Sequence, residues 1–278
     1  MRIVSLQPSV SIILDRLGCL DSLVACTKYC VDAVPALRER ALPVVHDSWS
    51  TKAEELLPVP ADLVIASVPY RQESLTAILK SGHPLLALAP KNLAGICQDI
   101  RLIASLVHQT ERGEALISGM QSEIAAVCSQ TARLPRCSVY CEEWGKPLIH
   151  SQPWVAELVE AAGGIFVGGP GATTSEAAIA AADPDVIIAA WCGAGDRVPL
   201  ERIVEQRDWR GLRAVRSGRV YCIADELLNT PAPTLIGGLH ALARAIHPEV
   251  FGAVASPDGR QIEEFLAVAS KLKYGCPT

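Results

Sequence analysis

Two carboxylates and a tryptophan follow one another where a buried strand is expected to end. The run Val139–Cys141 has the apolar character of such a strand, and Glu142, Glu143 and Trp144 come directly after it. A glutamate can serve as a general acid or base, and an indole offers a broad apolar surface to a ligand. Because successive side chains of a strand point to opposite faces, at most one of the two glutamates is expected to face a ligand.

Most of the tryptophans take similar positions. Trp49, Trp144 and Trp191 follow apolar runs and Trp154 opens a helix-like segment, whereas Trp209 is expected to pack in a core. In parallel α/β sheets, ligands bind beyond the carboxyl ends of the strands. The pattern therefore predicts an aromatic-lined site for a broad, flat and partly apolar ligand.

Two other kinds of site remain open from the residues alone. An enzyme could use Glu142 or Glu143 as its acid or base, although none of the common nucleophile, zinc-protease or phosphate-loop motifs is present. A metal ion could be bound directly by Cys, Glu and His side chains. The candidates for such a set are Glu142, Cys192, Cys30 and His46, which mix soft and hard ligands.

Composition narrows the class of protein. The chain has 278 residues, half of them apolar, and a net charge of −5 without a dense basic block, so a nucleic-acid partner is not expected. No window approaches the roughly 18 apolar residues of a membrane span. The ten cysteines are scattered without a C-x-x-C pair, and no signal peptide is recognised. These features favour a reducing, cytoplasmic location, or a periplasmic one if a leader has been removed.

Short apolar runs alternate with helical patterns, which is typical of α/β units with parallel strands. The predicted strands are Ile3–Leu6, Leu23–Ala25, Leu63–Ala66, Leu85–Leu88, Ser138–Cys141, Val186–Ala189 and Val220–Ile223. The predicted helices between them include Val10–Leu17, Ser74–Lys80, Val155–Ala161 and Leu200–Glu205.

One segment breaks this alternation. Residues 92–132 contain no proline and repeat apolar residues at helical spacing from Ile96 to Val107. A long helix is expected from Asn92, followed by a second helix from about Glu111. The chain is therefore predicted to consist of an N-terminal α/β lobe (1–91), a helical linker (92–132) and a C-terminal α/β lobe (133–278).

Several motifs in order resemble one protein family. The segments are RIVSLQPSVSIILDRLG at the start, then ELLPVPADLVIAS, DPDVIIAAWCG, WRGLRAVRSGRVYCI and NTPAPTLIGGLHALARAIHP. They resemble class III substrate-binding proteins of ABC transporters, over about residues 1–248. The segment VYCEEWGKPLIHSQPWVAELVEAAGG resembles a signal-less, cobalamin-binding-like subgroup. The resemblance implies two Rossmann-like lobes with parallel-type sheets, joined by a single long backbone helix, with a ligand cleft between the lobes.

The resemblance also implies a function and a set of site residues. The expected function is non-catalytic binding of a corrinoid or related metal chelate, which is a ligand and not an intrinsic cofactor. The candidate ligand-binding residues are Tyr29, Cys30, Trp49, Tyr70, Glu142, Glu143, Trp144, Trp154, Trp191 and Cys192. The resemblance implies an ABC permease as partner, and Glu54 and Glu176 stand at or near the positions where relatives dock on it.

Overall fold

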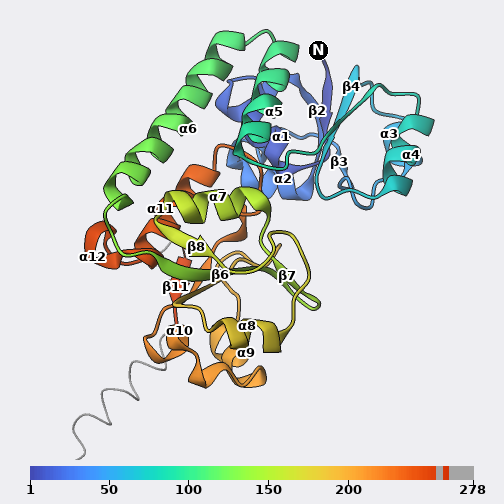
Figure 1. The fold of residues 1–278 in the computed structure, drawn as a ribbon. Coiled ribbons are helices and arrows are strands. Elements are labelled where there is room, and N and C mark those ends of the chain that lie inside the picture. Colours follow the sequence, from blue (N-terminus) through green and yellow to red (C-terminus); the bar gives the residue numbers. More distant parts are fainter. Residues whose placement is uncertain (255–258, 263–278) are drawn as a thin grey trace, which may run out of the picture. The chain divides into compact units, whose positions relative to one another are not determined.

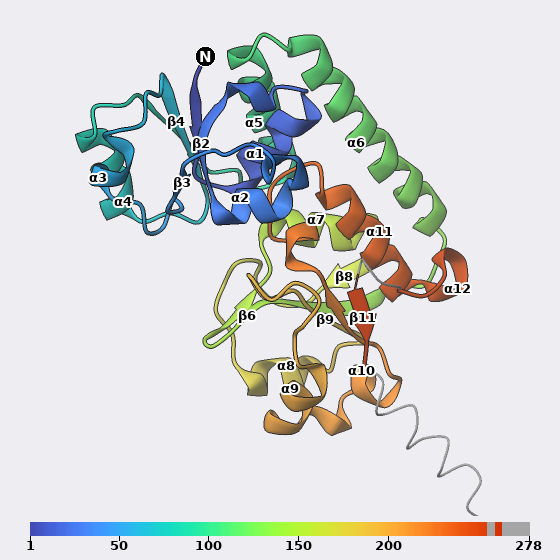
Figure 2. The same ribbon diagram turned by 180° about the vertical axis from the view of Figure 1, so that it is seen from behind.

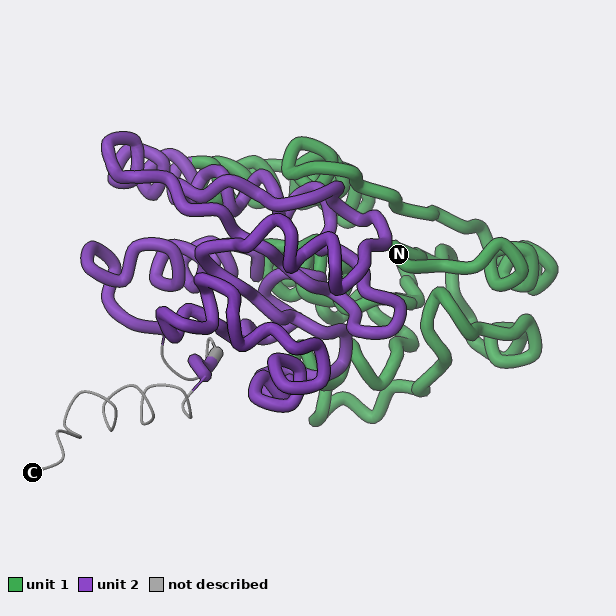
Figure 3. Tube along the Cα trace, turned by 60° about the horizontal axis from the view of Figure 1, so that its bottom comes forward, with its two compact units in different colours: residues 1–121, 230–233 green, residues 122–229, 234–278 purple. Residues whose placement is uncertain are grey.

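The computed structural model describes residues 1–254 and 259–262 of the chain. Figure 1 shows the order of its elements, and Figure 2 shows the same fold from behind. The chain divides into two compact units, which are coloured separately in Figure 3. Unit 1 comprises Met1–Gln121 and Thr230–Pro233, and unit 2 comprises Ser122–Asn229 and Thr234–Thr278.

Unit 1 is built on a parallel sheet of five strands in the order β3-β2-β1-β4-β5. The strands are β1 (Ile3–Ser5), β2 (Leu23–Thr27), β3 (Val44–Val45), β4 (Leu63–Ser67) and β5 (Leu85–Leu88). The first helices of the unit are α1 (Pro8–Arg16), α2 (Lys28–Ala33), α3 (Ala53–Leu56), α4 (Gln72–Lys80) and α5 (Leu93–Leu106). In both views α3 and α4 lie on one side of this sheet, and α1 and α5 lie on the other. The central strands are therefore covered on both faces, which explains why they read as uninterrupted apolar runs.

The helical segment predicted from Asn92 contains two helices. The side chain of Asn92 caps α5, because its Oδ1 accepts a hydrogen bond from the Gly95 amide at 2.8 Å. The helix ends at Leu106, and His108 adopts a left-handed conformation with φ of 56°. The next helix, α6 (Thr110–Thr131), has 22 residues and a length of about 33 Å. It is this second helix that continues from unit 1 into unit 2.

Unit 2 has a mixed sheet in the order β11-β10-β9-β6-β7, with β8 paired to β6. Strands β6, β8, β9 and β10 run parallel, whereas β7 and β11 are antiparallel to their neighbours. The strands are β6 (Cys137–Gly145), β7 (Leu148–His150), β8 (Gly164–Phe166), β9 (Val186–Ala189), β10 (Val220–Ile223) and β11 (Gly259–Gln261). The helices are α7 (Pro153–Ala161), α8 (Glu176–Ala182), α9 (Leu200–Gln206), α10 (Arg213–Arg216), α11 (Leu235–Ile246) and α12 (Pro248–Phe251).

Two sets of helices cover the sheet of unit 2. Helices α8 and α9 lie on one face and α7 and α11 on the other (Figure 1). The face under α8 and α9 holds a buried apolar cluster that includes Tyr140, Ile187 and Trp209. All seven predicted strands are present, but β6 extends to Gly145, so Glu142, Glu143 and Trp144 lie within the strand and do not follow it as predicted. Trp209 packs in the core as expected, with 1% of its surface exposed. In the described part of the chain, no helix combines the length and the apolar character that crossing a membrane requires.

Candidate functional site

The carboxylate of Glu142 lies at the centre of a buried polar network in unit 2. Its Oε1 accepts hydrogen bonds from Nε1 of Trp191 at 2.8 Å and from Nη2 of Arg207 at 3.0 Å. Its Oε2 accepts from Nη1 of Arg207 at 2.7 Å and from the Tyr140 hydroxyl at 2.6 Å. Only 2% of the Glu142 side chain is exposed. Because its oxygens already accept four hydrogen bonds, the lone pairs of this carboxylate are occupied by protein groups.

This network fixes the ring of Trp191. The indole follows β9, and its N–H is bonded to Glu142, so the ring has a defined orientation. On the other side lies Gly145, where a Cβ atom would collide with Cζ2 of Trp191. Only glycine leaves room for this close approach of an aromatic ring to the backbone. The indole is therefore held between a buried carboxylate and the hairpin that joins β6 to β7.

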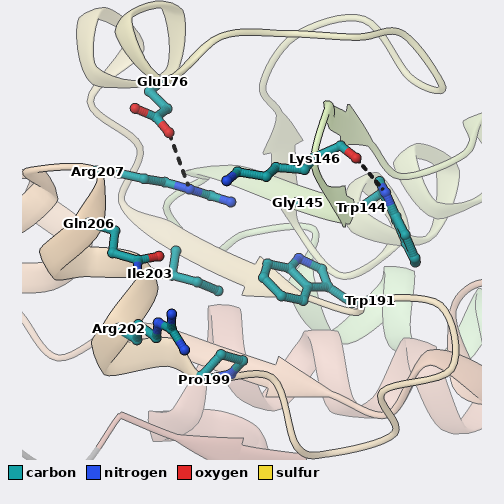
Figure 4. Close-up of a pocket in the computed structure, with 10 residues that line it drawn as sticks. All are labelled: Trp144, Gly145, Lys146, Glu176, Trp191, Pro199, Arg202, Ile203, Gln206 and Arg207. Carbon is teal, nitrogen blue, oxygen red and sulfur yellow. Dashed lines mark hydrogen bonds and ion pairs between the residues drawn. The ribbon is translucent and has the colours of Figure 1, made fainter.

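Trp191 forms part of the wall of a cavity of about 580 Å³. All of the residues that line the cavity belong to unit 2. Figure 4 shows the Trp191 ring among Lys146, Arg202 and Ile203. In the same view the carboxylate of Glu176 points toward Arg207. The residues around it are Trp144, Gly145, Lys146, Glu176, Pro199, Arg202, Ile203, Gln206 and Arg207. A concave apolar wall with a few charged groups at its edge is typical of small-molecule sites.

Helix α9 supplies one wall of this cavity. Pro199, Arg202, Ile203, Gln206 and Arg207 recur at spacings of three and four residues, so they share one helical face. The sequence interpretation did not include these residues, nor Lys146 and Gly145. The helical spacing was the available signal, but nothing in the sequence showed that this face would lie beside Trp191.

Glu143 has different surroundings from Glu142. Nε2 of Gln152 donates a hydrogen bond to its Oε2 at 2.8 Å, and the Cys192 thiol lies 3.8 Å from its Oε1. The pairing of β6 with β7 shifts register between Glu142 and Trp144. Burial raises the pKa of Glu143 above its ordinary value. The two glutamates therefore contact separate sets of residues, as strand alternation predicts.

The two remaining tryptophans of this region differ in exposure. Trp144 is 44% exposed, and its Nε1 donates to the carbonyl oxygen of Lys146 at 2.8 Å. Trp154 is only 3% exposed, and its Nε1 donates to the carbonyl oxygen of Leu228 at 2.8 Å. Trp144 lines the cavity, whereas Trp154 is a core residue of unit 2 and presents no free face. We therefore do not keep Trp154 among the candidate binding residues.

The candidate residues of unit 1 follow strands of its parallel sheet. Tyr29 comes after β2, Trp49 after β3 and Tyr70 after β4, so all three stand at the carboxyl edge of the sheet. Tyr29 and Trp49 are exposed and Tyr70 is half-buried. The guanidinium of Arg71 lies 4.5 Å from the centre of the Trp49 ring, in a cation–π contact. The ligand-facing role of the three residues stays a prediction.

The cysteines do not form a metal site in the described residues. Cys30 is completely buried, and its sulfur accepts a hydrogen bond from Thr27 Oγ1 at 3.2 Å. Cys192 is exposed and receives a contact from Nδ2 of Asn229 at 3.4 Å. Within residues 1–254 and 259–262, no group of three or more Cys, His, Asp or Glu residues is arranged to hold an ion. The alternative of a direct metal-ion binder therefore has no support from the geometry.

The two candidate docking residues lie at helix N-termini. Glu54 is exposed in the first turn of α3. Glu176 is the first residue of α8, and its Oε1 lies 3.9 Å from Nε of Arg207. Acidic residues are favoured in a first helical turn because they complement the helix dipole. Glu176 also lines the cavity of unit 2.

Solved structures share this fold. The periplasmic heme-binding protein from Roseiflexus sp. RS-1, in its apo form, is 25% identical with a TM-score of 0.75, covering 90% of this chain and 97% of that one. The periplasmic vitamin B12 binding protein of Vibrio cholerae is 21% identical with a TM-score of 0.70, covering 88% and 95%. The predicted two-lobe α/β fold with parallel-type sheets is thereby confirmed.

Sequence relatives agree with this assignment. A cobalamin-binding protein of Halobacterium salinarum is 23% identical over 261 residues, which are 88% of this chain and 69% of the relative. An uncharacterised ABC transporter substrate-binding lipoprotein of Bacillus subtilis is 22% identical over 263 residues, covering 90% and 81%. These names, periplasmic or lipoprotein, give no support to the expected cytoplasmic location.

The sequence profile of one family matches most of the chain. The match to the periplasmic binding protein family covers residues 3–227. Proteins of this kind take up solutes without transforming them, which removes the alternative of an enzyme with Glu142 or Glu143 as its acid or base. The chain belongs to the periplasmic binding protein family and is a non-catalytic solute-binding protein.

Proposed function

We propose that this protein binds a corrinoid or a related metal chelate, and that the cavity beside Trp191 is part of the binding surface. The observation that carries the proposal is the fixed indole of Trp191, held by Glu142 on one side and by Gly145 on the other. A rigid aromatic surface binds a flat ring without losing further conformational entropy. The relatives named for cobalamin, vitamin B12 and heme bind broad ring systems of this kind.

Titration calorimetry with cyanocobalamin and cobinamide tests the proposal. We expect saturable binding, and we expect Trp191→Ala to weaken it by roughly tenfold or more because the variant loses one aromatic surface. Trp154→Phe is the matched control, since Trp154 is a buried core residue that does not line the cavity. If no corrinoid or other metal chelate produces heat, the proposal is wrong.

The aromatic residues of unit 1 remain candidates for the same ligand. Trp49 is the strongest of them because its ring is 44% exposed and is positioned by Arg71. In the same titration, Trp49→Ala should weaken binding, whereas Trp144→Ala tests the corresponding exposed ring of unit 2. A loss of affinity in Trp144→Ala with no change in Trp49→Ala would restrict the site to the cavity of unit 2.

An ABC permease is the proposed partner. One relative is named as an ABC transporter substrate-binding lipoprotein, and Glu54 and Glu176 present carboxylates at helix starts. Co-purification with a permease expressed from the same genome tests this partnership. Loss of the complex in Glu54→Gln, but not in Glu73→Gln on the neighbouring helix α4, would support docking through Glu54.

Two observations bear on location and point in different directions. The nine cysteines among the described residues are all free, which is usual in a reducing compartment. The solved relatives, in contrast, are named as periplasmic. Cell fractionation with an antibody against the native protein distinguishes the two compartments.

A further inference from the structure

The edge of the Trp191 cavity has an excess of positive charge. Three cations line the cavity, Lys146, Arg202 and Arg207, together with a single carboxylate, that of Glu176. Arg207 is already neutralised by the buried Glu142 and lies 3.9 Å from Glu176. Lys146 and Arg202, in contrast, form no ion pair with any residue of the described ranges 1–254 and 259–262.

This local charge is opposite in sign to that of the whole chain, whose net charge is −5. The two unpaired cations come from different elements. Lys146 belongs to the hairpin between β6 and β7, and Arg202 belongs to α9. Figure 4 shows them on different sides of the Trp191 ring. An apolar ring that lies against the indole would therefore have one cation of the cavity lining on either side.

Cations in these positions favour a ligand whose rim carries negative charge. Ammonium and guanidinium groups form their strongest hydrogen bonds with ionised acids, and guanidinium can hold a carboxylate through two parallel bonds. A rim of neutral amides or esters would leave both cations without a counter-ion. Since the cations are solvent-exposed in the free protein, they cost little to maintain until a ligand arrives.

We infer that the ligand of this cavity is a macrocyclic chelate whose rim carries ionised carboxylates, which Lys146 and Arg202 bind. The inference rests on the proposed function and narrows its ligand class from metal chelates in general to acidic ones. Trp191 supplies the surface for the ring, and the two cations discriminate acids from their neutral derivatives. The buried pair of Glu142 and Arg207 holds the indole in place and makes no direct contact with the rim.

A matched pair of corrins tests the inference. Dicyanocobyrinic acid carries free carboxylates, whereas its heptamethyl ester has the same ring and metal without those charges. We expect the acid to bind about tenfold more tightly than the ester in fluorescence-quenching titrations of the full chain. Added salt should weaken binding of the acid and leave the ester unaffected, because exposed charges are screened.

Two variants and a control locate the effect. Lys146→Met and Arg202→Gln should each lower the affinity for the acid several-fold and leave the affinity for the ester unchanged. Arg216→Gln removes an exposed positive charge from α10, outside the cavity, and should change neither affinity. All three side chains are exposed, so each variant should unfold at the same urea concentration as the parent protein.

The outcomes separate this inference from the proposed function. If acid and ester bind equally tightly, or if both cavity variants retain the preference for the acid, the inference is wrong while the proposed function stands. If neither corrin binds and haem and its dimethyl ester also fail to bind, the proposed function is wrong and the inference falls with it.

Discussion

The two sides of strand β6 at its end give adjacent glutamates opposite environments. Glu142 lies on the side of the sheet that α8 and α9 cover, where Arg207 pairs with it through two hydrogen bonds. Glu143 has Gln152 and the Cys192 thiol as hydrogen-bond partners and no cation among the described residues. One side of the strand thus encloses an ion pair, whereas on the other side burial raises the pKa of a carboxyl group that has no cation beside it. Residue type alone does not determine what a buried carboxylate does; its partners do.

Removing the charge of Glu142 should have the largest effect. Glu142→Gln leaves the buried Arg207 guanidinium, whose side chain is 7% exposed, without its bidentate partner and with only the exposed Glu176 carboxylate 3.9 Å away. Loss of one partner of such a pair costs about 3–5 kcal/mol. We expect a decrease of this size in the free energy of unfolding measured by urea denaturation. A decrease below about 1 kcal/mol, the value of an exposed ion pair, would show that solvent reaches the network.

An added methyl group at Gly145 should have an intermediate effect. Gly145→Ala places a Cβ atom against the Trp191 ring, and overpacking of this kind costs about 1–3 kcal/mol. Gly119→Ala is the control, because Gly119 is exposed within α6 and a Cβ atom there would meet nothing within 4 Å. That substitution should stabilise the protein by up to about 1 kcal/mol through helix propensity. Equal effects of the two substitutions would mean that Trp191 moves freely.

The stability of the protein should depend on pH through Glu143. Its pKa is raised by burial above the ordinary value of 4.5, so the folded state retains the proton to higher pH than the unfolded state does. Stability therefore decreases as the pH rises from the ordinary pKa to the folded-state pKa, and is then constant. Glu143→Gln removes this contribution.

Urea unfolding of the parent protein and of Glu143→Gln over the range from about pH 4 to pH 7 measures the difference. The advantage of the parent over the variant should shrink with increasing pH. An advantage that grows instead would mean that a cation stabilises the Glu143 carboxylate.

The longer helices and strands could be predicted because the sequence patterns that determine them are local. The strand at Val186–Ala189 and the helix at Leu200–Gln206 follow from an apolar run and from helical spacing. The short strands β3, β7, β8 and β11 were not predicted, because two or three residues are too few to show an alternating pattern. The role of Glu142 was not predictable either, because its partner Arg207 is 65 residues away in the sequence. Contacts of that kind depend on how the sheet and α9 pack, and no local pattern encodes them.

The chain crosses between its two units more than once, so a single cut does not separate them. The segment Thr230–Pro233 belongs to unit 1, although the residues on either side of it belong to unit 2. The polypeptide therefore passes from one unit to the other three times, once within α6 and once at each end of this segment. A gene cut after Gln121 yields an incomplete first fragment and a second fragment that carries the missing piece. We expect the two halves, expressed together, to reassemble more readily than either folds by itself.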